Sequence, residues 1–481
     1  MSAANIQAQP PLEFIPPQLN PLFLRITHLF LPVWIRTQSA IAQIEADNVE
    51  KLVDLMHDFQ GGKIRLLIAF RHPQVDDPLC LGYLLHRLVP NVAASMGKPL
   101  KFPVHAHCMY DRGIPLWAGS HIGWMISRLG GTPIQRGKAD WVGLKTARNL
   151  FLNGRFPMAA APEGGTNGLN EIISPLEPGI AQMGFWCAQD LQKAQRQEQV
   201  IILPVGIQYS YIDPPWDAIA KLLSELETAS GLPKSSQFSS SDLDVLYTRL
   251  IRLSERLLSL MEDFYKRFYH QELPTVSTYV NNSDSNSDND SGILSSYTEE
   301  TNEAIKIRLQ ALLDAALKVS EAYFHLPPKG NLNDRCRRVE QAGWNYIYRE
   351  DFKDIGDINN LSLVERSLAD KVAEEATSRM WHMRLVENFV AVSGKYVREK
   401  PTAERFSQTL LIIWQIVQRI QNQDSFERPS LGRQKANLVV GEPIAVSERY
   451  EEYQSSRKNA RKAVADLTDD LQKAMEKLII C

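Results

Sequence analysis

The chain has 481 residues, of which 44% are hydrophobic and 23% are charged, and its formal net charge is −3. This length is enough for two or three domains, and the small net charge excludes the strongly basic composition that is typical of nucleic-acid-binding proteins. The five cysteines are odd in number and lack the spacing of a metal site, so we expect free thiols rather than a disulfide framework.

The N-terminal region contains two different patterns. Residues 1–20 are rich in proline and should be a loosely ordered lead, whereas residues 21–36 are apolar on nearly all sides apart from Arg25, Pro32 and Arg36. No stretch of the chain reaches the about 18–20 apolar residues that a transmembrane helix needs. Two interpretations stay open for 21–36: a helix lying in a membrane interface, and a helix docked on the protein core.

A helix is predicted at residues 38–58, and a buried strand at residues 64–70. Arg71, His72 and Pro73 follow the strand, and the proline prevents it from continuing. His72 and Asp77 lie directly beyond the strand, where ligands bind in open α/β sheets. A carboxylate one helical turn after a histidine can fix its tautomer and stabilise its imidazolium form. His72 is therefore a candidate general base, with Asp77 as its partner.

Two histidines mark the next predicted strand, residues 101–110, which follows a predicted helix at 79–97. His105 and His107 lie on one face of this strand because alternate residues of a strand point the same way. A His-x-His pair could bind a metal, but no third ligand stands at a helpful spacing. We therefore interpret both histidines as structural.

Arg136 lies in the segment TPIQRGK, residues 132–138. An isolated arginine in such a segment is most often a surface residue in a turn. An arginine presented from a strand end can instead bind a phosphate through two parallel hydrogen bonds, and Lys138 is a weaker candidate for the same role.

A glycine-rich turn follows the strand predicted at residues 156–161, with the sequence Pro162-Glu163-Gly164-Gly165-Thr166. Glycines at a strand end let the backbone approach a ligand closely and offer N–H donors to an oxyanion or a phosphate. The carboxylate of Glu163 could accept a hydrogen bond from a ligand hydroxyl.

A proline interrupts the apolar strand predicted at residues 200–205. Pro204 is unusual there, because proline is excluded from central strands except at edges and bulges. This irregularity favours a functional role for the segment.

The H-x4-D spacing of His72 and Asp77 resembles the glycerolipid acyltransferase family, and within it the 1-acylglycerol-3-phosphate acyltransferases. The family usually reads Asn-His-x-Ser-x-x-Asp-Pro, and this chain has Arg71 in place of the Asn and Gln74 in place of the Ser. The register through Asp-Pro favours Asp77 over Asp76 as the partner of the histidine.

Three later segments are similar to further blocks of that family in the same order. The family has a strand ending in Arg, then Phe-Pro-Glu-Gly-Thr-Arg, then an apolar run that contains a proline. Here these correspond to Arg136, to 162–166 and to Pro204, but Asn167 stands near the place of the last Arg of the second block. That Arg helps to hold the acceptor's phosphate in the family, so an acceptor without a phosphate is an alternative here.

The resemblance implies a role for each of these residues. His72 would be the general base and Asp77 would orient it, while Pro204 would line the acyl site. The acceptor would be positioned by Arg136, Glu163, Gly164, Gly165 and Thr166.

The character of the sequence changes at about residue 214, where long helical patterns replace strands. Residues 275–298 are rich in Ser, Asn and Asp and are expected to be a disordered loop. A strand pattern returns at 436–446, and with the helix predicted at 466–480 it resembles the end of the family's catalytic domain. If 214–434 is an insertion, residues 436–446 should pair with the strand at 199–206.

We therefore expect an α/β fold, with a mixed, mostly parallel sheet flanked by helices as in the glycerophosphate acyltransferases, interrupted by an inserted all-α domain. The expected segments are an N-terminal lead with the helix at 21–36, two parts of an acyltransferase domain, and an inserted helical domain between them. Their boundaries are 1–44 for the lead, 45–213 and 435–481 for the acyltransferase domain, and 214–434 for the insertion.

The expected activity is transfer of a fatty acyl group from an acyl thioester to a hydroxyl of a glycerolipid, most simply 1-acylglycerol-3-phosphate. The donor would be acyl-CoA or acyl-carrier protein, with no bound cofactor or metal and no nucleic-acid partner. The protein would act as a peripheral protein on the cytoplasmic side of a membrane. The alternatives are a lipid-binding scaffold without turnover and a metal hydrolase that uses His72, Asp77, His105 and His107.

Overall fold

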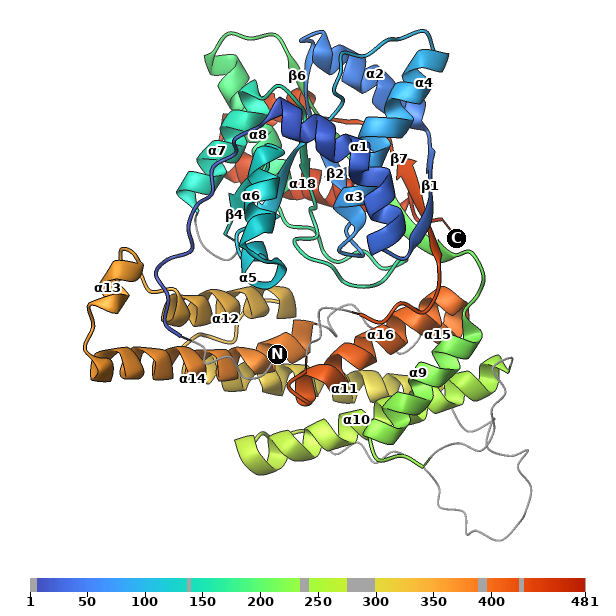
Figure 1. Ribbon diagram of the computed structural model, residues 1–481, viewed down its shortest axis with the longest axis vertical. Helices are drawn as coiled ribbons and strands as arrows, with labels where there is room; N and C mark the ends of the chain where they lie inside the picture. Colours follow the sequence, from blue (N-terminus) through green and yellow to red (C-terminus); the bar gives the residue numbers. More distant parts are fainter. Residues whose placement is uncertain are drawn as a thin grey trace. The chain divides into compact units, whose positions relative to one another are not determined.

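The computed structural model describes residues 7–135, 140–233, 242–274, 299–387, 396–423 and 428–480. The chain forms two compact units. The sheet unit comprises Leu12–Ile212 and Arg433–Cys481, and the helical unit comprises Met1–Pro11 and Asp213–Gly432 (Figure 1). Each unit is described by itself below.

The sheet unit contains a mixed sheet in the order β1-β7-β6-β2-β5-β3-β4, and β8 also pairs with β6. The pairs β1/β7, β6/β2, β2/β5, β5/β3 and β3/β4 are parallel, and only β6/β7 and β6/β8 are antiparallel among the described strands. The predicted α/β class with a mostly parallel sheet is confirmed. The strands are β1 (Ile41–Asp47), β2 (Ile64–Phe70), β3 (His107–Asp111), β4 (Thr132–Ile134), β5 (Met158–Ala160), β6 (Gln199–Tyr211), β7 (Gln434–Val440) and β8 (Ile444–Ala445).

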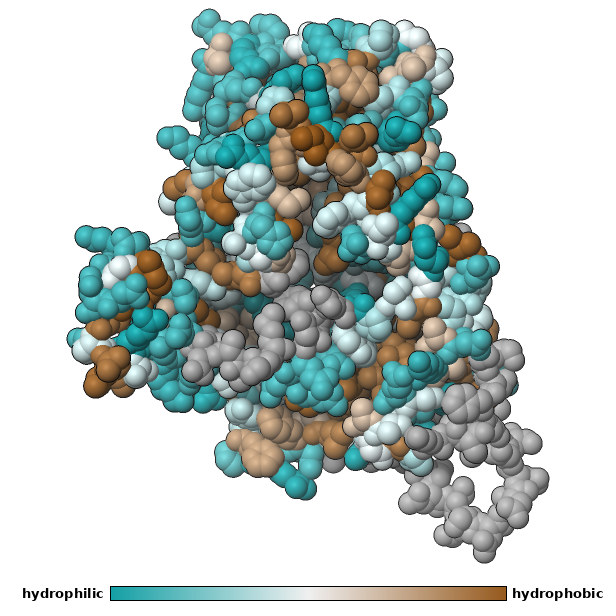
Figure 2. All heavy atoms as spheres, viewed as in Figure 1, coloured by the Kyte–Doolittle hydropathy of each residue, from teal (hydrophilic) through white to brown (hydrophobic). Residues whose placement is uncertain are grey.

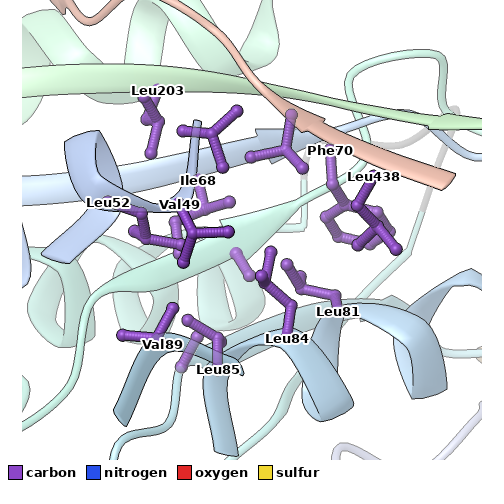
Figure 3. Close-up of a cluster of buried hydrophobic side chains, with 14 of the residues drawn as sticks. Val49, Leu52, Ile68, Phe70, Leu81, Leu84, Leu85, Val89, Leu203 and Leu438 are labelled. Carbon is purple, nitrogen blue, oxygen red and sulfur yellow. The ribbon is translucent and has the colours of Figure 1, made fainter. Parts of the chain in front are cut away.

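Helices cover both faces of this sheet. Successive side chains of a strand point to opposite faces, and the strands carry apolar side chains on both, so both faces must be buried. Ile68 and Phe70 of β2 enter the core on one face with α1, α2, α3, η1 and α4 (Figure 3). Leu67 and Ala69 enter the core on the other face with α7, α8 and α18, which Figure 1 labels. The helical segments of the unit are α1 (Pro21–Gln38), α2 (Val49–Gln60), α3 (Asp77–Tyr83), the π-helical turn η1 (Leu84–Leu88), α4 (Val89–Ser95), α5 (Ile114–Ala118), α6 (Ser120–Arg128), α7 (Trp141–Asn153), α8 (Gly179–Lys193), η2 (Ser447–Arg449), α17 (Tyr450–Ser455) and α18 (Arg457–Glu476).

Arg65 is the one charged residue in the strand β2, and it is buried with the rest of the strand. Its guanidinium donates hydrogen bonds to the carbonyl oxygens of Phe151 (2.7 Å) and Gly154 (3.0 Å), at the end of α7. Carbonyls at a helix C-terminus have no partner within the helix, so the arginine satisfies them from the sheet.

The prediction of a helix over residues 38–58 was wrong for its first part. Residues 41–47 form the edge strand β1, in which partly buried and exposed side chains alternate after the buried Ile41, and α2 starts only at Val49. The strand forms because β7 pairs with it in parallel, from a segment almost 400 residues later in the chain. Similarly, the strand expected at 101–110 is shorter, because β3 covers only His107–Asp111.

The helix predicted at 21–36 is present as α1, and Asn20 caps it by accepting hydrogen bonds from the N–H groups of Leu22 and Phe23. One side of α1 packs on the core, as the docked interpretation expected, through Leu24, His28, Leu31 and Ile35. No described helix is both long and apolar enough to cross a membrane.

The predicted pairing of residues 436–446 with the strand at 199–206 is confirmed, since β7 and β8 both pair antiparallel with β6. This arrangement also explains Pro204. Its carbonyl accepts a hydrogen bond from the N–H of Gly441 (2.9 Å), in the segment that links β7 to β8. The nitrogen of a strand residue points to the same side as its carbonyl, so the nitrogen of Pro204 also faces this linking segment. A missing N–H therefore breaks no ladder hydrogen bond at this position.

The helical unit consists of helices among its described residues, apart from a bridge between Gln9 and Tyr348. Leu246, Leu250 and Leu253 recur at helical spacing in α10 and are buried, whereas Leu260 of the same helix is exposed. The loop expected to be disordered, 275–298, lies outside the described residues. The helices are α9 (Trp216–Ala229), α10 (Leu243–Tyr269), α11 (Glu299–Tyr323), α12 (Leu332–Ile347), α13 (Ile355–Asn359), α14 (Leu363–Glu387), α15 (Tyr396–Glu399) and α16 (Ala403–Ile420).

Candidate functional site

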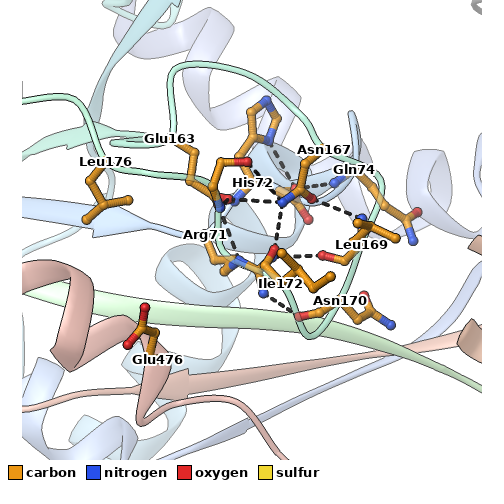
Figure 4. A network of polar contacts seen from close by, with 12 residues as sticks. Arg71, His72, Gln74, Glu163, Asn167, Leu169, Asn170, Ile172, Leu176 and Glu476 are labelled. Carbon is orange, nitrogen blue, oxygen red and sulfur yellow. Dashed lines mark hydrogen bonds and ion pairs between the residues drawn. The ribbon is translucent and has the colours of Figure 1, made fainter. Parts of the chain in front are cut away.

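Two loops meet at the carboxyl ends of the neighbouring parallel strands β2 and β5. The first loop, 71–76, follows β2, and the second, 161–178, follows β5, with Ala69 paired to Ala160 in the sheet. The backbone N–H of His72 donates to Glu163 Oε1 at 3.0 Å, so the two predicted motifs lie in direct contact (Figure 4). The sheet thus brings together motifs that are about 90 residues apart in sequence.

His72 and Asp77 form a hydrogen-bonded pair, with 3.0 Å between His72 Nδ1 and Asp77 Oδ2. The Asp77 side chain is fully buried, whereas 21% of the His72 side chain is exposed. Because an ionised carboxylate only accepts hydrogen bonds, we assign the proton to Nδ1, which leaves the lone pair on Nε2. No described residue forms a hydrogen bond with Nε2, so this nitrogen is available to a ligand proton.

Asp77 is held in place by three donors. The backbone N–H of Gln74 donates to Oδ2 at 2.7 Å, His72 donates to the same oxygen, and the phenol of Tyr209 donates to Oδ1. Burial raises the pKa of Asp77, while these three hydrogen bonds act in the opposite direction. The geometry is that of an oriented base, in which the carboxylate stabilises the imidazolium form of the histidine.

His72 forms its side-chain hydrogen bond with Asp77 and not with Asp76, in agreement with the register argument that favoured Asp77. Burial and the neighbouring charge of Asp77 raise the pKa of Asp76 to about 6. No described residue donates a hydrogen bond to its side chain, although it stands at the start of α3.

Arg71 is buried and fills the centre of the second loop (Figure 4). Its guanidinium donates to Glu163 Oε1 (Nε, 3.3 Å) and to the carbonyl oxygens of Leu169 (2.8 Å), Asn170 and Ile172. These four acceptors use most of its five N–H donors, so Arg71 holds the loop together rather than facing a ligand.

Glu163 is also directed into the loop and not outward. Its carboxylate accepts hydrogen bonds from the backbone of His72 and of Ser174 (2.9 Å), and from the side chains of Arg71 and Asn167 (3.4 Å). Its oxygens therefore fix the position of His72, which is a different role from the contact with an acceptor hydroxyl that the sequence suggested.

Asn167, which stands near the place of an arginine in the family, is engaged inside the same loop. Its amide donates to the carbonyl oxygen of Ile172 (2.6 Å) and to Ser174 Oγ (3.2 Å), and its oxygen accepts from the N–H of Leu169 (2.9 Å). Asn167 and the buried Arg71 therefore direct their hydrogen bonds into the loop and not toward a ligand.

The turn Gly164–Thr166 is partly exposed. Gly164 has a positive φ of 71°, which a glycine adopts without strain, and its N–H donates to the carbonyl of Ala161 at 3.3 Å. No described group accepts a hydrogen bond from the N–H of Gly165 or of Thr166, and the side chain of Thr166 is exposed. These two N–H groups are available to a ligand oxygen.

Arg136 and Lys138 lie outside the described residues. Pro204 is buried in β6 at the level of Ala69 of β2. Its predicted contact with an acyl chain stays a prediction.

His105 and His107 hold the end of α6. A ring nitrogen of His105 lies 2.9 Å from the carbonyl oxygen of Leu129, and one of His107 lies 2.9 Å from that of Gly130. Burial lowers the pKa of both residues, to about 4 for His105. Within the described ranges, no group of three or more His, Cys, Asp or Glu side chains could hold a metal ion.

Tyr209 is the member of the site that sequence reasoning missed. It lies on β6, 132 residues after Asp77, and its hydroxyl also lies 3.5 Å from Cys80 Sγ. No local pattern marks it, because an inward-facing tyrosine on a buried strand looks like an ordinary core residue.

Comparison with known proteins gave no match to any protein-family model or to any curated protein sequence.

Proposed function

We propose that the protein is an O-acyltransferase that transfers a fatty acyl group from an acyl thioester, acyl-CoA or acyl-carrier protein, to a hydroxyl of a glycerolipid. The single observation that carries the proposal is the pair His72–Asp77 at the end of β2, with the buried carboxylate on Nδ1 and with Nε2 open. The order of the sequence motifs supports it, and the acceptor that the resemblance suggests is 1-acylglycerol-3-phosphate.

In the proposed reaction, His72 Nε2 takes the proton of the acceptor hydroxyl as its oxygen attacks the thioester carbonyl carbon. The resulting oxyanion would accept hydrogen bonds from the N–H groups of Gly165 and Thr166, which have no described partner. The carbon–sulfur bond then breaks, and the leaving thiolate receives the proton from the imidazolium. The products are an ester and a free thiol, and no covalent intermediate with the enzyme is required.

We also propose that the sheet unit is an acyltransferase-type domain and that residues 213–432 are a helical domain inserted into it. Support comes from the sheet itself, because β7 and β8 from the last part of the chain complete it beside β6. With a thioester donor and a lipid acceptor, the proposed enzyme would act as a peripheral protein on the cytoplasmic side of a membrane.

One observation favours a second candidate acceptor, a lipid alcohol without a phosphate. The donor groups of Arg71 and Asn167 are engaged within the loop, and the carboxylate of Asp76 would repel a phosphate. Arg136 and Lys138 would then be left to bind a phosphorylated acceptor.

The test is transfer of a labelled acyl group from acyl-CoA and from acyl-carrier protein by the purified full chain. The acceptors would be 1-acylglycerol-3-phosphate, glycerol-3-phosphate, other lysolipids, diacylglycerol and prenyl alcohols. We expect His72→Ala to lower the rate by at least about a thousandfold, and His57→Ala, a change at an exposed histidine of α2, to leave it unchanged.

The panel separates the candidates. A preference for diacylglycerol or a prenyl alcohol would identify the second candidate acceptor. Lipid binding that is equal in the native chain and in His72→Ala, without transfer to any acceptor, would replace the proposal by a lipid-binding scaffold.

A further inference from the structure

The outward side of α1 is an apolar surface without a partner in the sheet unit. Its residues follow the helical spacing i, i+4, i+7, i+8, i+11 and i+12, so they form one stripe along the helix. Their exposed fractions lie between 46% and 72%. The residues of this stripe, named here the α1 face, are Leu22, Ile26, Leu29, Phe30, Val33 and Trp34.

The α1 face continues onto α6. The ring of Phe23 packs edge-on against Trp124 of α6, with 5.3 Å between the ring centroids, and Trp124 is itself half-exposed. Figure 2 shows hydrophobic side chains gathered along the line of α1 in the view of Figure 1. Soluble proteins rarely leave a continuous apolar surface of this kind uncovered, so it indicates an interaction site.

Charge along α1 indicates the chemistry of the partner. Residues 21–38 contain no Asp or Glu, whereas Arg25 and Arg36 are exposed. At 100° per residue both arginines lie on the same side of the helix as Leu29, along one edge of the α1 face. A cationic edge beside an apolar stripe with a tryptophan fits the interface of a bilayer that contains anionic lipid.

A second copy of the chain fits this surface less well. An isologous pairing with antiparallel α1 helices would place the same patch against itself and bring Arg25 and Arg36 of both copies to one edge. No acidic residue of α1 is available to neutralise them, so the contact would be repulsive at its edges.

The docked side of the helix is firmly held, which makes α1 a rigid platform. Leu24, Leu31 and Ile35 are buried, and Leu31 lies against α3, the helix that begins at Asp77. An interfacial helix normally folds as it binds the lipid, whereas this one is folded and capped already, and so loses little conformational freedom on binding.

We propose that the α1 face is a membrane-docking surface that lies in the interface of an anionic bilayer, with its apolar stripe among the acyl chains and with Arg25 and Arg36 at the headgroups. This inference does not depend on acyl transfer, and its test reports binding alone.

The test is co-sedimentation of the full chain with vesicles of phosphatidylcholine, alone or mixed with phosphatidylglycerol. The variant Leu29→Glu/Phe30→Glu places charge in the centre of the α1 face, and we expect its partition to mixed vesicles to fall by at least about tenfold. The variant Arg25→Gln/Arg36→Gln should lose about tenfold on mixed vesicles and little on phosphatidylcholine alone.

The matched control is Val364→Glu/Leu368→Glu, which changes two exposed apolar residues on α14 of the helical unit. It should bind as the native chain does. Near-UV circular dichroism and the melting temperature should be native for every variant, because the altered side chains are exposed.

Three results would overturn the proposal. They are unchanged sedimentation of Leu29→Glu/Phe30→Glu, an equal loss in the α14 control, and a native chain that fails to bind vesicles but forms a dimer that Leu29→Glu/Phe30→Glu dissociates. The last result would assign the α1 face to a second copy of the chain.

Discussion

At the scale of single residues, the site separates into a pair that local spacing reveals and a set that only the fold reveals. His72 and Asp77 are five residues apart, so one turn and the start of α3 bring them together. Arg71, Glu163 and Tyr209 meet through the sheet, from strands that are far apart in sequence. The sequence predicted Glu163 as a site residue. It did not predict that the carboxylate points into the loop toward Arg71, because no rule of local spacing pairs residues so far apart in the chain.

Tyr209 should act as a positioning residue for Asp77. Tyr209→Phe removes the donor on Oδ1 and leaves the burial of Asp77 unopposed on that side, so the pKa of Asp77 should rise further. A protonated Asp77 no longer stabilises the imidazolium of His72. The acid limb of the pH–rate profile of Tyr209→Phe should therefore move to higher pH. At pH values within this limb, we expect its kcat/KM to be about tenfold lower than that of the native enzyme.

The control for Tyr209→Phe is Tyr83→Phe, a hydroxyl deletion at the end of α3. A pure packing defect would lower the rate equally at all pH values. An acid limb that stays in place in Tyr209→Phe would contradict the positioning role.

At the scale of elements, the errors of sequence reasoning lie where a distant segment decides the structure. Residues 41–47 were predicted as helix and form β1, because pairing with β7 outweighs the local pattern. The buried strand β2 was predicted correctly, since seven consecutive residues with one charge leave few alternatives. Pro204 was recognised as irregular, but the passage of the chain from β7 to β8 that accommodates it needed the tertiary structure.

Gly441, which follows β7, lies close against Pro204 of β6, so a larger side chain at this position should destabilise the sheet unit. A Cβ added at Gly441 would lie 2.9 Å from Cγ of the buried Pro204 and 3.1 Å from Cδ1 of the partly buried Leu478. Gly441→Ala should lower the free energy of unfolding of the sheet unit by about 1–3 kcal/mol, as overpacking does in cores.

Urea unfolding followed by fluorescence would measure this change. The control is Gly179→Ala at the start of α8, where a Cβ meets no atom within 4 Å, and it should be neutral or slightly stabilising. Equal free energies of unfolding for the two variants would contradict this prediction, because they would show that the space around Gly441 accommodates a Cβ without strain.

At the scale of the whole molecule, the sheet unit is built from two segments, and the chain leaves it and returns at adjacent points. The N–H of Ile212 donates to the carbonyl of Arg433 at 3.0 Å. The return strand was predictable because residues 436–446 have a clear strand pattern. The pairing of β7 with β1 was not predictable. Nothing in the local sequence indicates that β7 pairs with β6 along one edge and with β1 along the other.

This adjacency predicts that the sheet unit can fold alone. A protein in which residues 213–432 are replaced by a short Gly-Ser turn, and residues 1–11 are removed, should keep β6 and β7 paired. We expect a cooperative thermal transition and dispersed amide resonances. A molten product that binds a hydrophobic dye would contradict this expectation.

The position of β7 also has a consequence for biosynthesis. β1 and β6 are made early, but the strand that lies between them is made only after the entire helical unit. At a synthesis rate of about 5–20 residues per second, these 220 residues would take roughly 10–40 s on the ribosome. Throughout that time the edges of β1 and β6 that later pair with β7 lack this partner. We therefore expect a nascent chain to be prone to strand pairing with other chains until residues 434–440 emerge.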